Sequence, residues 1–129
     1  MKKAVLTMNV LDGNFGVCRL AGASKIPEWV LESDFYSITK TSDELSIVCP
    51  EADVPGNVIC ERGWKGLKVD GPLDFGLTGI LAGISAVLAG KEVSIFAVST
   101  YDTDYILVRK KDLETAVEAL EGAGYVILS

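Results

Sequence analysis

Residues 65–129 carry a succession of hydrophobic patterns that few folds can accommodate. Four stretches have the alternation or the β-branched, apolar composition of strands, and two have apolar residues at the spacing of amphipathic helices. A polar connection separates each stretch from the next. The strands are predicted at 65–69, 93–98, 105–108 and 125–128, and the helices at 77–88 and 113–120.

The resulting order, strand-helix-strand-strand-helix-strand, is that of the ferredoxin-like split βαβ motif. Residues 3–10 look extended, and the N-terminal half repeats this order in a shortened form, with strand-like stretches at 16–20, 35–39, 44–49 and 57–62 and only short helical pieces between them. We therefore predict an α+β fold of tandem ferredoxin-like units, with antiparallel sheets and helices on one face. Residues 1–63 form a unit with reduced helices and residues 64–129 form the second. A single unit with an N-terminal extension is the alternative.

The absence of histidine narrows the possible functions. The chain has 129 residues and no histidine, so it lacks the commonest general base and the commonest metal ligand. Its three cysteines, Cys18, Cys49 and Cys60, form no CxxC pair. We interpret them as reduced thiols, with Cys49 and Cys60 buried in apolar surroundings, and not as a disulfide framework or a metal site. We expect no catalytic residue, no cofactor and no enzymatic activity; an enzyme relying on Asp, Tyr or Cys alone is the least favoured class.

The charge balance argues against polyanionic partners. The chain has 12 Lys and Arg residues and 18 Asp and Glu residues, which gives a net charge of −6. The basic residues form no cluster in the sequence. Such a chain is poorly suited to a nucleic-acid backbone or to an anionic membrane surface.

The longest apolar stretch, around 80–89, is too short to span a bilayer, and the N-terminus lacks a signal-peptide pattern. We expect a cytoplasmic protein.

Two loops concentrate groups that could contact a ligand. The connection Ser99–Asp104 holds hydroxyls, a phenol and two carboxylates between two apolar stretches. The segment 75–79 contains two glycines where a helix is predicted to start, and a helix start offers free N–H groups and a positive dipole end. From the residues alone, a plain turn is the favoured interpretation of the first loop, because Asp and Thr hydrogen-bond their own backbone in turns. The second loop fits a capping loop equally well.

Three stretches of the sequence resemble a known family: FYSITKTSDELSIVCPE at 35–51, ERGWKGLKVDGPLDFGLTGIL at 61–81 and VSIFAVSTYDTDYILVRKKDL at 93–113. Together they resemble the ACT domain superfamily, and more closely the CASTOR-like tandem ACT proteins related to cytosolic arginine sensors and to aspartate kinase regulatory domains. One departure is the segment 90–94, Gly-Lys-Glu-Val-Ser, where relatives often have Gly-Ile-Ser. The resemblance implies paired ACT domains that associate side by side and bind an amino acid at a domain interface.

The resemblance also implies which residues meet the ligand. It favours the ligand-binding interpretation of both loops, with Asp104 accepting the ammonium group or a basic head group and Tyr101 forming an aromatic wall. It implies a regulatory ligand sensor with a possible protein partner. An exposed sheet edge predicts at least a homodimer, and the acidic turn slightly favours a basic amino acid. A dimerisation or protein-interaction module without a ligand is the alternative. The expected ligand-binding residues are Gly76, Leu77, Thr78, Gly79, Thr100, Tyr101 and Asp104.

Overall fold

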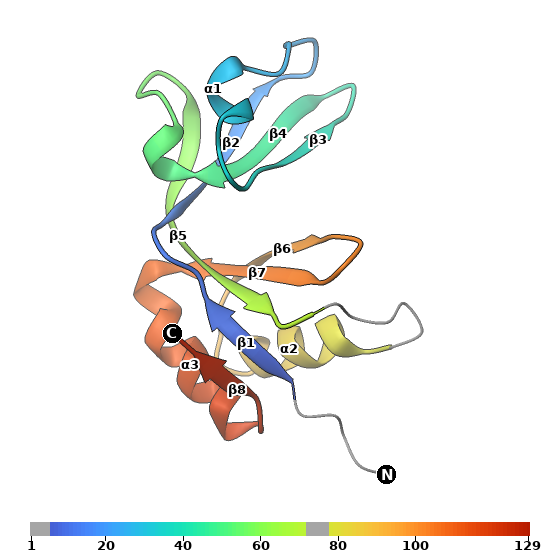
Figure 1. The fold of residues 1–129 in the computed structure, drawn as a ribbon, viewed down its shortest axis with the longest axis vertical. Helices are drawn as coiled ribbons and strands as arrows, with labels where there is room; N and C mark the ends of the chain where they lie inside the picture. The colour runs from blue at the N-terminus through green and yellow to red at the C-terminus, as the bar shows by residue number, and fades with distance from the viewer. Residues whose placement is uncertain (1–5, 72–77) are drawn as a thin grey trace. The chain divides into compact units, whose positions relative to one another are not determined.

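A computed structural model describes residues 6–71 and 78–129 of the chain (Figure 1). Its contacts define two compact units. The N-terminal unit is Gly13–Trp64, and the C-terminal unit combines Met1–Asp12 with Lys65–Ser129. This grouping differs from the division at residues 63 and 64 expected from the sequence, because the first twelve residues belong with the C-terminal half.

The N-terminal unit has the strand order of a ferredoxin-like sheet. Its sheet runs β3-β4-β2-β5, and every neighbouring pair is antiparallel. The two helical positions of the motif are reduced to one short α-helix and one 3-10 helix. The elements are β2 (Phe15–Ala21), α1 (Glu28–Leu31), β3 (Ser37–Lys40), β4 (Glu44–Pro50), η1 (Glu51–Asp53) and the first half of β5 (Ile59–Val69).

Local chemistry explains why these elements begin and end where they do. Pro27 lies at the N-cap of α1 in an extended conformation, so the helix starts directly after it. In the β3–β4 hairpin, the hydroxyl of Thr41 accepts the N–H groups of Asp43 and Glu44, each at 3.1 Å. The core of the unit lies between the sheet and α1 and contains Cys18, Val30, Leu45, Ile47, Cys49 and Val54.

The C-terminal unit contains the remaining strands and the two longer helices. The strand order is β8-β1-β5-β7-β6. Helices α2 and α3 contact one another and contribute Ile84, Leu88, Ala116 and Leu120 to the core. The elements are β1 (Thr7–Val10), the second half of β5, α2 (Ile80–Ala89), β6 (Ile95–Ser99), β7 (Asp104–Arg109), η2 (Lys110–Asp112), α3 (Leu113–Gly122) and β8 (Val126–Leu128).

The predicted class, tandem ferredoxin-like units, is confirmed with one addition. Strand β1 is inserted between the first and last strands of the motif in the C-terminal unit, antiparallel to β5 and parallel to β8. Met8 on this strand is fully buried in the core. The four strands predicted in residues 65–129 are therefore only part of this sheet. The fifth strand, β1, comes from the N-terminal end of the chain. Within residues 6–71 and 78–129, no helix has the length and apolar character needed to cross a bilayer.

Candidate functional site

The connection between β6 and β7 is a tight turn closed by its own threonines. Ser99 and Asp104 are the last paired residues of the two strands. The N–H of Thr100 donates to the carbonyl of Thr103 at 2.8 Å, and the Thr100 hydroxyl accepts the N–H of Thr103 at 3.2 Å. The same hydroxyl donates to the Thr103 carbonyl at 3.0 Å. Thr100 thus hydrogen-bonds backbone groups inside the turn, as threonines in turns commonly do.

Thr103 is a residue whose importance sequence reasoning missed. It is 4% exposed, and it is the buried polar side chain among the described residues. Its hydroxyl donates a hydrogen bond of 2.7 Å to the carbonyl oxygen of Val69, the last residue of β5. This bond joins the turn to the strand end from which the connection to α2 departs. No local pattern marks the pairing, because the two residues lie 34 positions apart.

Asp104 is held in a defined orientation. Its Oδ1 accepts a hydrogen bond of 2.6 Å from the hydroxyl of Ser99, directly across the β6–β7 pair. Asp104 as a whole is half-buried, and its bond to Ser99 is exposed, whereas Asp102 is exposed and Tyr101 exposes 81% of its surface at the tip of the turn. The predicted residues Thr100, Tyr101 and Asp104 are therefore gathered in one turn, with one carboxylate oriented by a neighbouring hydroxyl.

The start of α2 differs from the expectation at one position. The N-cap is Gly79, in the left-handed conformation with φ of +75°, and no side chain caps the helix. Thr78 precedes the cap and is exposed; of its two possible roles, helix cap and ligand contact, the first is not observed. A left-handed cap suits glycine, which has no Cβ to clash. The predicted residues Gly76 and Leu77 lie outside the described residues.

The turn and the helix start lie on the same side of the C-terminal unit in Figure 1. The bond between Thr103 and Val69 fixes the turn to the end of β5, and β5 leads through the connection to α2. Within the described residues, no hydrogen bond joins the turn to Thr78 or Gly79. This side of the unit thus offers an oriented carboxylate and the N-terminal end of a ten-residue helix.

The three cysteines lie together in the N-terminal unit. Cys18 and Cys60 are direct partners across β2 and β5, and all three thiols are free. Cys18 and Cys49 are buried, but Cys60 is only half-buried, which corrects the expectation that Cys60 is buried. Burial raises the pKa of the Cys49 thiol to about 11. Burial, followed by hydrogen bonding with Cys60, raises the pKa of Cys18 well above the usual range. Cys18 and Cys49 are therefore poor nucleophiles near neutral pH.

Comparisons with known protein families agree with this architecture. A model described as the ACT domain matches residues 59–122. A second model, of an N-terminal domain family, matches residues 13–57. The first match includes all of β5, α2, β6, β7 and α3, and with them the described part of the candidate site. Residues 59–122 of the chain are thus an ACT domain.

Individual relatives extend the comparison. The chain is 32% identical over 97 residues to the bovine cytosolic arginine sensor for mTORC1 subunit 1, an alignment of 67% of this chain and 30% of that protein. The human sensor subunit is 31% identical over the same length. The chain therefore spans only about a third of these sensor subunits.

Solved structures add evidence on the fold. The crystal structure of a protein from Agrobacterium tumefaciens is 39% identical, with a TM-score of 0.91, and the alignment covers 98% of this chain and 94% of that one. The aspartate kinase of Clostridium acetobutylicum is 16% identical, with a TM-score of 0.66 over 92% of this chain and 34% of that chain. This second likeness concerns the fold alone.

Proposed function

We propose that the protein is a regulatory protein that binds a free amino acid at the side of the C-terminal unit formed by the β6–β7 turn and the start of α2. The observation that carries the proposal is the ACT domain match over residues 59–122, which includes both elements. The similarity to subunits named as cytosolic arginine sensors supports an amino acid as the ligand and the cytosol as the location.

The geometry of the turn supports this choice of ligand. An α-amino acid needs an anionic acceptor for its ammonium group and N–H donors for its carboxylate. Asp104 can supply the acceptor, because its carboxylate is accessible and already oriented by the hydroxyl of Ser99 at 2.6 Å. The start of α2 at Gly79 can supply N–H donors and the positive end of the helix dipole. Thr100 and the exposed ring of Tyr101 lie in the same turn and complete the described part of the proposed site.

The remaining predicted contacts belong to the connection before α2. Gly76 and Leu77 lie outside the described residues, and Thr78 and Gly79 precede the first residue of the helix. We propose that the backbone of these four residues approaches the ligand carboxylate. A basic amino acid such as arginine or lysine is favoured, because the turn carries two carboxylates and no cationic side chain.

We further propose that the ligand acts through association of copies, not through catalysis. Strand β6 lies at the end of the described sheet order in the C-terminal unit, and an edge strand can pair with another chain. A ligand bound beside such an interface would stabilise one arrangement by its differential affinity and alter the surface offered to a protein partner. We therefore propose a homodimer whose association responds to the amino acid.

A thermal-unfolding screen tests the proposal. The protein, freed of carried-over ligand by unfolding and refolding, is heated in the presence of each common amino acid at millimolar concentration. Ligand that binds only the folded state raises the unfolding temperature, so one amino acid or one chemical class should do so in a saturable manner. Unfolding temperatures that stay equal across the whole panel would contradict amino-acid binding.

A further inference from the structure

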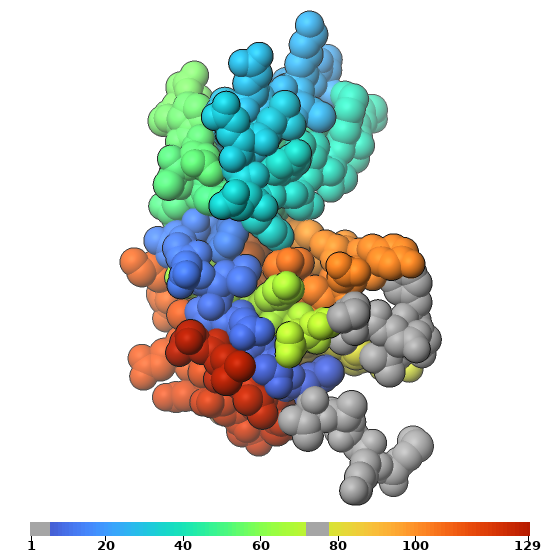
Figure 2. All heavy atoms as spheres, viewed as in Figure 1, coloured from blue at the N-terminus to red at the C-terminus, as the bar shows by residue number. Residues whose placement is uncertain are grey.

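A groove lies on the C-terminal unit between α3 and the edge of the sheet formed by β8 and β1. Its volume is about 470 Å³, and its apolar lining consists of Val10, Leu113, Val117 and Ile127. These four side chains are only partly buried although they pack against the hydrophobic core. Figure 1 shows α3, β8 and β1 next to one another, and Figure 2 shows the atoms of β8 on this surface.

Three glutamates form the outer rim of the groove. Glu114, Glu118 and Glu121 lie on α3 at spacings of four and three residues, which places them on one stripe of the helix. All three side chains are exposed. Within residues 6–71 and 78–129, none of the three forms an ion pair or a hydrogen bond through its side chain. The rim is thus a row of carboxylates without cationic partners in the described part of the chain.

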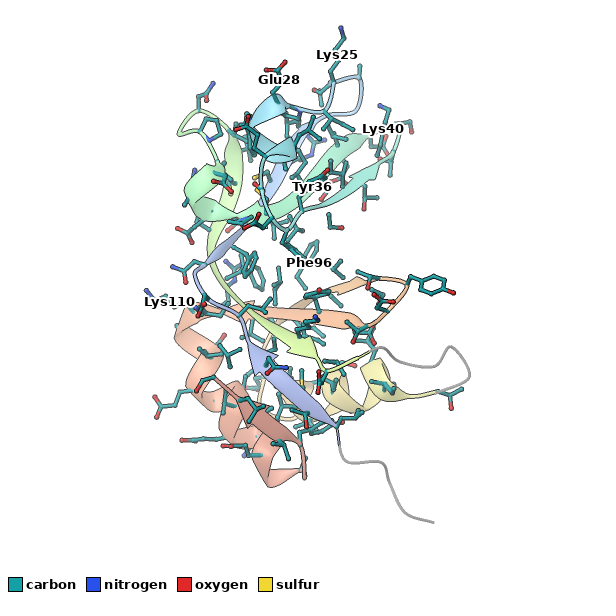
Figure 3. The ribbon with its side chains drawn as sticks, in the orientation of Figure 1. Lys25, Glu28, Tyr36, Lys40, Phe96 and Lys110 are labelled. Atoms are coloured by element: carbon teal, nitrogen blue, oxygen red, sulfur yellow. The ribbon has the colours of Figure 1, made fainter. Side chains whose placement is uncertain are left out.

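Two basic residues lie at the N-terminal end of the row, and a third, Lys91, lines a neighbouring hollow together with Glu118. Lys110 and Lys111 belong to η2, which immediately precedes α3, and Figure 3 shows Lys110 at this end of the helix. The last turn of α3 contains no basic residue. The lining of the groove itself contains three glutamates and no basic side chain. An occupant with positive charge would complement most of its length.

We propose that this groove is a docking surface for a basic amphipathic peptide segment of a partner protein. One or two aliphatic side chains of the segment enter the apolar groove, and flanking Lys or Arg residues pair with Glu114, Glu118 and Glu121. The combination of an apolar floor and an unpartnered acidic rim favours this occupant over a neutral or acidic segment. The surface is separate from the β6–β7 turn, so the inference stands whether or not an amino acid binds there.

Fluorescence anisotropy with a labelled peptide of alternating leucine and arginine tests the proposal. A second peptide, in which serine replaces every leucine, keeps the charge and removes the apolar side chains. The first peptide should bind saturably and the second should bind much more weakly, because both the groove and the rim contribute. Equal binding of the two peptides, or no binding of either, would overturn the proposal.

Two charge-matched variants locate the binding. The groove variant is E114Q/E118Q/E121Q, and the control variant E28Q/E32Q/D34N removes the same number of charges from exposed positions of the N-terminal unit (Glu28 is labelled in Figure 3). We expect the groove variant to lose about tenfold in affinity while the control keeps the wild-type value, since several exposed ion pairs are removed together. Equal losses in the two variants would show unspecific attraction and overturn the assignment.

A third variant separates the groove from the rim. Val117→Thr keeps the shape of a half-buried side chain and adds a hydroxyl to the groove lining. Circular dichroism confirms that the variant is folded before the titration. We expect weaker peptide binding at unchanged charge. If sedimentation instead showed that the groove variant alone changes self-association of the chain, a second copy and not a partner peptide would be the occupant, and the proposal would be overturned.

Discussion

The buried hydroxyl of Thr103 donates a 2.7 Å hydrogen bond to the carbonyl oxygen of Val69, and this bond fastens the β6–β7 turn to the end of β5. Because Val69 and Thr103 are both buried, neither group can exchange the bond for water. The position of the turn, and with it the orientation of the proposed site, depends on this pair.

Replacing Thr103 with valine tests this dependence. The substitution keeps the shape of the side chain and leaves the Val69 carbonyl without its partner, so we expect a loss of about 1–3 kcal/mol in the free energy of unfolding. Thr103→Ser, which keeps the hydroxyl, should lose less. Urea unfolding of the two variants measures the difference. Valine and serine variants of equal stability would show that the hydrogen bond does not hold the turn.

The close packing of β2 against β5 makes a second prediction. A Cβ placed on Gly16 would lie 2.5 Å from the Sγ of Cys60, which is closer than such atoms approach. Gly16→Ala should therefore destabilise the protein by about 1–3 kcal/mol. Cys60→Ala removes the obstructing sulfur, so the double variant should be more stable than the sum of the two single effects predicts. Additive effects in chemical unfolding would argue against the clash.

Two glycines at the end of α3 should respond in opposite directions to the same substitution. Gly122 is the last residue of the helix, and a Cβ there would meet nothing within 4 Å. Gly122→Ala should stabilise the protein by about 0.5–1 kcal/mol, because alanine is the better helix former. Gly124 has φ of +99°, so Gly124→Ala should destabilise. Thermal unfolding that shifts in the same direction for both would contradict the described helix end.

The buried thiols make stability fall at alkaline pH. Burial raises the pKa of Cys49 from 9.0 to about 11, so the folded state keeps a proton that the unfolded state loses. The stabilising effect is fully present below pH 9.0 and is lost as the pH rises towards 11. Urea midpoints measured under reducing conditions from neutral to alkaline pH should decline more steeply in the wild type than in C18A/C49A. Parallel curves would mean that the thiols do not contribute.

Sequence periodicity predicted those helices and strands whose own residues carry a regular apolar spacing. The amphipathic helices and the strands around β6 and β7 were placed nearly correctly, because their apolar spacing reflects the face that each element buries. The reduced helices of the N-terminal unit were also expected, from prolines such as Pro27. The class of fold followed from the order of these elements.

Features that depend on distant residues escaped prediction. Strand β1 joins the C-terminal unit by pairing with β5 and β8. The sequence of residues 7–10 does not indicate which strands they pair with. β5 was divided near Gly63 because glycine usually ends a strand, whereas here Gly63 lies inside the strand with φ of +80°. At the site, the turn itself was expected, but Thr103 was given no role, and the N-cap of α2 is Gly79.

The most direct test of amino-acid binding at the turn compares two carboxylates in that turn. Calorimetric titration with the amino acid identified by the thermal screen is performed on wild type, Asp104→Asn and Asp102→Asn. The two variants lose the same charge, but only Asp104 is half-buried and oriented by Ser99. We predict that Asp104→Asn lowers the affinity by at least about tenfold, as expected for a charge-assisted hydrogen bond, and that Asp102→Asn leaves it nearly unchanged. Equal affinities for wild type and Asp104→Asn would contradict the proposed site.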